Sequence, residues 1–360
     1  AYGAFDEKRM MRIFVTDCEG PIAKNDNAFE LSNWLIPKGD RFFTIVSRYD
    51  DVLADIVKKP GYKAGDTLKL IVPFLKAYGA TNELMKRFSS ETLLLVPGAA
   101  ETLRYIRSIM PSFIVSTSYE PYIHALCDAI DFPKENVYCT KIDIDQYELS
   151  KEESEKLKAL KEEISEMPMI EIPQGARSIS DLPPESQRVI KRLDEIFWEE
   201  IPKMRIGRAL IDVNPIGGYE KANAVKEIAA IFNRPLSSIM YVGDSITDVE
   251  PFRLVRKGGG LTVSFNGNQY AIREAEIAVL SHHTVILAIL AENFRRFGRE
   301  HVLKLVENWD ISMLEDYCSP SLFRQLRNLY PENAPWVERI TAENMERLMH
   351  ESTAFSKTVR

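Results

Sequence analysis

Six polar side chains in this sequence have the types and the spacing that phosphoryl transfer requires. They are Asp17, Glu19, Ser116, Lys221, Asp244 and Asp248. Carboxylate oxygens bind Mg²⁺, which usually keeps several waters and takes one or two protein carboxylates together with a phosphate oxygen. A carboxylate can also attack phosphorus to form an acyl-phosphate, while a second carboxylate protonates the leaving group and later deprotonates water. An ammonium group neutralises the remaining negative charge of the transferred phosphoryl group.

Five short apolar runs predict the strands that position these residues. They are Arg12–Thr16, Ser112–Val115, Ala209–Val213, Ile239–Val242 and Leu261–Phe265. Their hydrophobicity is continuous rather than alternating, which is typical of strands covered on both faces. Helical patterns such as Lys221–Phe232 lie between them. This alternation predicts an α/β fold with a three-layer, Rossmann-like parallel sheet core, in which ligands bind at the carboxyl ends of the strands.

Two intervals between the predicted strands, residues 22–92 and 146–208, are too long to be simple connections. Each is therefore predicted to form a helical insertion. One contains helix-like stretches such as FELSNWLI, and the other begins with the charged helical pattern KEESEKLKALKEEISE. Trp309 and Trp336 are expected packing anchors of a helical tail. Residues 1–10 are treated as a leader and left out of the fold prediction. The expected parts are a Rossmann-like core (11–21, 93–145 and 209–290), a helical cap insertion (22–92), a second helical insertion (146–208) and a C-terminal helical extension (291–360).

Four sequence motifs resemble those of the haloacid dehalogenase superfamily. FVTDCEGP is similar to the first motif, D-x-D-G after a hydrophobic strand, and FIVSTSYEPY is similar to the second motif of the phosphoserine phosphatase-like branch. GGYEKANAV matches the third motif, and YVGDSITD matches the fourth, G-D-x-x-x-D. The motifs occur in the family's order, and the chain also resembles uncharacterised archaeal members of the superfamily.

The resemblance implies a role for each catalytic candidate. Asp17 would be the nucleophile, which becomes phosphorylated, and Glu19 would be the general acid/base. Ser116 would donate a hydrogen bond to the phosphoryl oxygens, and Lys221 would orient the nucleophile and balance charge.

The resemblance also implies a Mg²⁺ site. Asp17 and Asp244 would be ligands, and the backbone carbonyl of Glu19 would also contact the ion. Asp248 would support either the metal or Lys221.

The sequence departs from the family pattern at two of these motifs. Glu19 stands where Asp is usual, which places the carboxyl about one C–C bond farther out. Thr117 and Ser118 replace the paired glycines of phosphoserine phosphatase, so phosphoserine is not implied as the substrate. The superfamily places cap domains at the positions of both insertions. A cap restricts the mouth of the site, which favours a small phosphorylated metabolite.

The first hypothesis is therefore a hydrolase, a Mg²⁺-dependent phosphatase of phosphoric monoesters. A second hypothesis keeps the phospho-aspartyl intermediate on Asp17 but transfers the phosphoryl group to a hydroxyl other than water. A third is a non-catalytic subunit of an assembly that docks a protein partner through its C-terminal helices.

The composition of the sequence argues against several other classes of protein. The net charge of −7 disfavours binding to nucleic acid or to anionic membrane surfaces. No apolar run is long enough to span a membrane. The cysteines are scattered without a C-x-x-C pair, which argues against a disulfide framework or zinc site and favours the cytoplasm.

Overall fold

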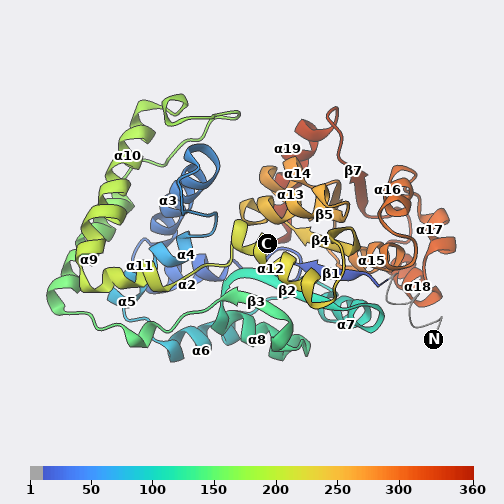
Figure 1. The fold of residues 1–360 in the computed structure, drawn as a ribbon, viewed down its shortest axis with the longest axis horizontal. Helices are drawn as coiled ribbons and strands as arrows, with labels where there is room; N and C mark the ends of the chain where they lie inside the picture. The colour runs from blue at the N-terminus through green and yellow to red at the C-terminus, as the bar shows by residue number, and fades with distance from the viewer. Residues whose placement is uncertain (1–10) are drawn as a thin grey trace.

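The computed structural model describes residues 11–360, and the predicted leader lies outside them. A seven-stranded sheet forms the centre, in the order β3-β2-β1-β4-β5-β6-β7 (Figure 1). All neighbouring strands are parallel except β7, which runs antiparallel to β6. The strands are β1 (Ile13–Thr16), β2 (Ser112–Tyr119), β3 (Val137–Thr140), β4 (Ile239–Gly243), β5 (Leu261–Phe265), β6 (Ile277–Leu280) and β7 (Trp336–Arg339).

Helices cover both faces of the sheet, which confirms the predicted three-layer α/β class. Phe14 of β1 packs toward α7, α8 and α15 on one face, whereas Ile13 and Val15 pack toward α12, α13, α14 and α19 on the other. This alternation follows from the opposite directions of successive side chains in a strand. The helices are α7 (Ala99–Ile109), α8 (Glu120–Ile130), α12 (Tyr219–Ile231), α13 (Val249–Lys257), α14 (Gln269–Glu274), α15 (Val285–Phe297) and α19 (Met345–Val359).

The predicted strand at Ala209–Val213 is wrong, whereas the other four predicted strands are confirmed. Ala209–Asp212 forms the short helix α11. Ala209, Leu210 and Val213 are buried, whereas Ile211 and Asp212 are exposed, so the buried side chains share one face of a helical turn. Periodicity cannot separate a strand from a helix in so short an apolar run.

The two insertions pack together as one helical lobe beside the sheet (Figure 1). A single hydrophobic cluster joins residues 28–88 to residues 144–213. Lys161 of α9 is fully buried, and its Nζ donates to the carbonyl of Pro37 in the first insertion at 2.9 Å. The helices are α2 (Asn27–Leu35), α3 (Gly39–Asp51), α4 (Thr67–Leu70), α5 (Val72–Ala77), α6 (Asn82–Thr92), α9 (Lys151–Glu166) and α10 (Pro184–Glu195).

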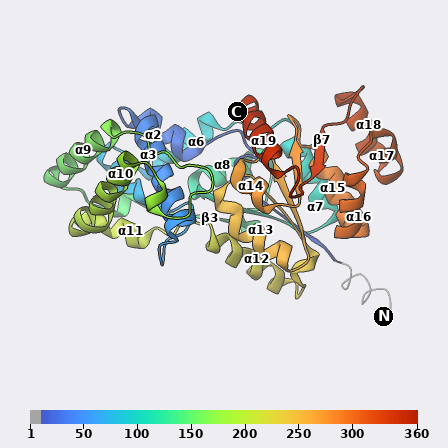
Figure 2. The ribbon, with the colours of Figure 1, turned by 90° about the horizontal axis from the view of Figure 1, so that it is seen from above.

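The C-terminal segment is mostly helical, with α16 (Arg299–Glu307), α17 (Ile311–Tyr317) and α18 (Pro320–Leu329) at the opposite end of the molecule from the lobe (Figures 1 and 2). It also supplies strand β7, which the sequence did not reveal. Trp309 is half-buried against the core, but Trp336 is 51% exposed, so the expectation of a packing anchor there is wrong. The adjacent Val337 of this edge strand faces the core instead. None of the helices in residues 11–360 is long and apolar enough to cross a membrane.

Candidate active site

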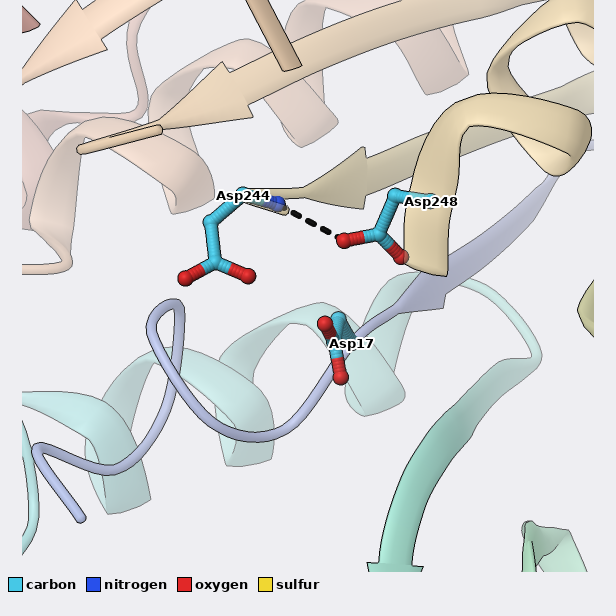
Figure 3. Close-up of side chains that lie close together, drawn as sticks. All are labelled: Asp17, Asp244 and Asp248. Carbon is cyan, nitrogen blue, oxygen red and sulfur yellow. Dashed lines mark hydrogen bonds between the residues drawn. The ribbon is translucent and has the colours of Figure 1, made fainter. Parts of the chain in front are cut away.

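The carboxylates of Asp17 and Asp244 meet at the carboxyl edge of the sheet because β1 and β4 are neighbours (Figure 3). Asp17 follows β1 and Asp244 follows β4. One carboxylate oxygen from each of these residues and one from Asp248 lie within 4.8 Å of one another. All three residues are buried, so the cluster is shielded from solvent.

Lys221 connects two of these carboxylates from the first turn of α12. Its fully buried Nζ lies 3.1 Å from Asp17 Oδ2 and donates to Asp248 Oδ1 at 2.8 Å. The hydroxyl of Tyr241 donates to the same Asp248 oxygen at 2.5 Å, and the amide of Asp244 donates to Oδ2 at 2.8 Å. Burial alone would raise the pKa of Asp248, but Lys221, Tyr241 and the amide together lower it. Asp248 is therefore an anion that fixes Lys221.

Two glycines allow the carboxylates to approach this closely. Gly20 has a φ of +106°, and a Cβ there would lie 2.1 Å from Asp244 Oδ2. A Cβ on Gly243 would lie 2.4 Å from Asp248 Cγ. Real Cβ atoms do not approach other heavy atoms so closely. The positive φ of Gly20 also disfavours any residue other than glycine there. Both motif glycines are thus steric requirements of the site.

Ser116 and Glu19 belong to a second hydrogen-bonded group, joined by Ser118. The buried Ser116 hydroxyl donates to Ser118 Oγ at 3.0 Å, and the Ser118 hydroxyl donates to Glu19 Oε1 at 2.5 Å. The amide of Asn27 donates to Glu19 at 3.3 Å. Burial raises the pKa of Glu19 to about 8, and the charge of Asp26 adds to this. A carboxyl with this pKa holds a proton at neutral pH.

The carboxyl groups of Asp17 and Asp244 both have raised pKa values. Burial raises the pKa of Asp17, and the charge of Asp248 raises it further against the opposing effect of Lys221. Burial also raises the pKa of Asp244 to about 7, although Arg360 opposes this. Two desolvated carboxylates side by side are stabilised as anions by a bound cation.

A cavity of about 620 Å³ opens over these groups, between the core and the lobe. The core contributes the carboxylates and Ser116, and the lobe contributes side chains that include Phe43 and Asp51. Helix α19 contributes a further wall, with Lys357 and Arg360. Nothing in the sequence motifs pointed to this wall.

The structure places the main candidates close together, and it adds three residues beside them that sequence reasoning did not single out. Ser118 entered the prediction only as a departure from the family pattern, and Tyr241 only as part of an apolar run. A tyrosine inside a fully buried strand needs a hydrogen-bond partner for its hydroxyl, which is the signal that could have identified Tyr241. Arg360 has no such signal, because only the fold brings it to the site.

Comparison with known proteins gives one family and several similar structures. Residues 110–286 match the model of a family described as haloacid dehalogenase-like hydrolase. A gene product from Archaeoglobus fulgidus is 24% identical, with 97% of each chain covered and a TM-score of 0.78. A substrate-bound phosphoserine phosphatase is 13% identical, covering 76% of this chain and 94% of that one, with a TM-score of 0.46. Comparison with curated proteins gives no match.

The matched segment holds Ser116, Lys221, Asp244 and Asp248, four of the six predicted site residues. Asp17 and Glu19 precede it in sequence but lie beside it in the same sheet edge. The resemblance noted from the motifs is thus confirmed, because residues 110–286 match the haloacid dehalogenase-like hydrolase family.

Proposed function

We propose that this chain is a Mg²⁺-dependent phosphatase of phosphoric monoesters that forms a phospho-aspartyl intermediate on Asp17. The observation that carries the proposal is the position of the Asp17 carboxylate. It faces a cavity of about 620 Å³, with Lys221 Nζ at 3.1 Å and the carboxylate of Asp244 close by. This combination supplies a nucleophile, its counter-charge and an oxygen ligand for a hard cation in one buried place.

The donor set fits Mg²⁺, since hard oxygen ligands are what this ion prefers. Asp17 and Asp244 would hold it, together with the backbone carbonyl of Glu19. Asp248 fits a supporting role, because its oxygens already accept hydrogen bonds from Lys221, Tyr241 and backbone amides. When bound, the ion screens the charge of the phosphate from the attacking carboxylate.

The chemistry of the chain's own residues then runs in two steps. An Asp17 oxygen bonds to phosphorus while the ester P–O bond breaks, and Glu19 gives its proton to the leaving oxygen. Glu19, now ionised, takes a proton from water as that water attacks phosphorus. The acyl–phosphate bond breaks, which releases inorganic phosphate and restores the Asp17 carboxylate. Ser116 and Ser118 are placed to donate hydrogen bonds to the phosphoryl oxygens.

We infer that the substrate is small, because the lobe packs directly on the mouth of the site. A Cβ on Gly65 would lie 2.8 Å from Thr117 Cγ2, and one on Gly217 would lie 2.0 Å from the carbonyl oxygen of Ala64. Backbone in such close contact leaves a bounded cavity rather than an open groove. A phosphorylated metabolite suits that cavity better than a phosphoprotein.

The test is hydrolysis of an aryl phosphate with and without Mg²⁺. Asp17→Asn removes the nucleophile and is expected to lower kcat by roughly 10³-fold or more. Asp128→Asn is the matched control, since Asp128 is 71% exposed and pairs with Lys134. Activity of the Asp17→Asn protein equal to the wild type would contradict the mechanism. Appearance of a phosphorylated alcohol in place of inorganic phosphate would identify a phosphotransferase.

A further inference from the structure

Helix α19 is fixed to the loop that carries Asp244. The hydroxyl of Ser352, fully buried in α19, donates to the carbonyl of Gly267 at 2.6 Å. Gly267 follows β5, and the amide of the next residue, Asn268, donates to the carbonyl of Asp244 at 3.0 Å. Phe355 adds an apolar contact to His282, with ring centroids 4.7 Å apart. The end of α19 is therefore held against the catalytic edge of the sheet.

Arg360 extends from the end of this helix into the cavity. Its Nη2 donates to Asp244 Oδ2 at 3.2 Å, and its side chain is 39% exposed. The carboxylates of Asp17, Glu19 and Asp26 also act on it electrostatically. Among the described residues that line the cavity, the cations are Lys357 and Arg360, whereas Lys221 lies buried behind Asp17.

Besides the ion pair with Asp244, α19 has two other contacts with the catalytic edge of the sheet, through Ser352 and Phe355. These contacts do not involve Arg360, so they can hold the helix while the guanidinium group changes partners. Asp244 is the same carboxylate that would hold Mg²⁺ under the proposed function. A bound cation on Asp244 repels the guanidinium, which then faces the place where the phosphoryl group must lie.

We propose that Arg360 is a substrate-binding residue, whose guanidinium group leaves Asp244 and pairs with the phosphoryl oxygens of the bound phosphomonoester. The inference rests on the proposed function and adds to it a phosphate-binding group from outside the four motifs. A guanidinium group suits this task because its planar set of donors matches two oxygens of a phosphate at once. Lysine offers the charge without that geometry.

The test compares Arg360→Gln and Arg360→Lys with Arg347→Gln. Arg347 is on the same helix but pairs with Glu338 and Glu351, away from the cavity, so it is the matched control. With Mg²⁺ present, Arg360→Gln is expected to raise both the KM for an aryl phosphate and the Kd for inorganic phosphate by about tenfold or more. Arg360→Lys should recover part of the loss, and Arg347→Gln should behave as the wild type.

Two results would overturn the inference. One is an Arg360→Gln protein that binds inorganic phosphate in calorimetry as the wild type does. The other is a Tm lowered by the substitution with KM and Kd unchanged, which would mean that Arg360 only stabilises α19. Asp17→Asn separates this failure from that of the proposed function. If Asp17→Asn abolishes turnover while Arg360→Gln binds phosphate normally, only the role of Arg360 is wrong.

Discussion

At the scale of single residues, the site requires a glycine without a side chain as well as its reactive side chains. Gly20 combines a φ of +106° with a position at which a Cβ would lie 2.1 Å from Asp244 Oδ2. Its role is therefore to leave the space that the Asp244 carboxylate occupies. Backbone conformation alone does not explain the glycine.

Gly20→Ala is expected to displace the Asp244 carboxylate and to weaken Mg²⁺ binding by about tenfold, with a matching loss of activity. Calorimetric titration with Mg²⁺ measures this directly. Gly175→Ala is the control, since Gly175 has a φ of +80° but no atom within 4 Å of a Cβ. Equal effects of the two substitutions would show that backbone strain, rather than contact with Asp244, is responsible.

At the scale of elements, the positions of the loops after β1 and β4 could be predicted, because a parallel sheet brings together loops that are far apart in the sequence. Apolar runs that end at Asp17 and at Asp244 predict parallel strands, and the carboxyl ends of such strands meet at one edge. Short elements were harder to predict. The strands VYCT and IAVL were missed, and ALIDV was predicted as a strand, because a run of four or five residues carries no periodicity. Tertiary packing against the lobe decides that Ala209–Asp212 is helical.

Helices α3 and α9 are joined across the two insertions by arginine side chains. Arg41 of α3 donates from Nε to the carbonyl of Ser165 at 2.8 Å and from Nη2 to the carbonyl of Met167 at 2.5 Å. These carbonyls end α9, where a helix leaves its acceptors without backbone partners. Arg48 donates in the same way to the carbonyl of Ile170. The first insertion thus caps the second.

Arg41→Ala is expected to destabilise the lobe by about 1–3 kcal/mol, because two helix-end carbonyls lose a charged donor. Amide hydrogen exchange of α9 is the measurement, since it reports local opening rather than global unfolding. Arg87→Ala on the exposed face of α6 is the control. Protection of α9 that is unchanged in Arg41→Ala would mean that the hydrophobic cluster alone holds the insertions together.

At the scale of the whole molecule, the buried acidic site opposes the stability of the fold at neutral pH. The pKa of Glu19 is raised from 4.5 to about 8, and that of Asp244 from 3.8 to about 7, in both cases chiefly by burial. The folded protein therefore holds protons that the unfolded chain releases. The protonated carboxyl groups of Glu19 and Asp244 therefore contribute to the free energy of unfolding. This contribution is fully present below pH 4 and is lost as the pH rises through 7 and 8.

Without metal, the Tm is therefore expected to fall by a few degrees between pH 6 and pH 8. Adding Mg²⁺ at pH 8 should restore it, because an ion that binds only the folded state raises its stability. Thermal unfolding in the presence of a chelator gives the metal-free values. Asp244→Asn should reduce the dependence on pH. Two results would contradict this explanation. One is a metal-free Tm that rises between pH 6 and pH 8, and the other is a change of Tm with pH that is the same in Asp244→Asn as in the wild type.

The third wall of the cavity could not be predicted from sequence, because Lys357 and Arg360 reach the site only after β7 has paired with β6 and α19 has packed on α14. This dependence has a consequence for the timing of synthesis. As the chain leaves the ribosome, the motif residues and the lobe emerge first, with β6 as an uncovered edge of the sheet. The cavity stays open on one side until Arg360 has emerged, so the site is completed only after β7 has completed the sheet.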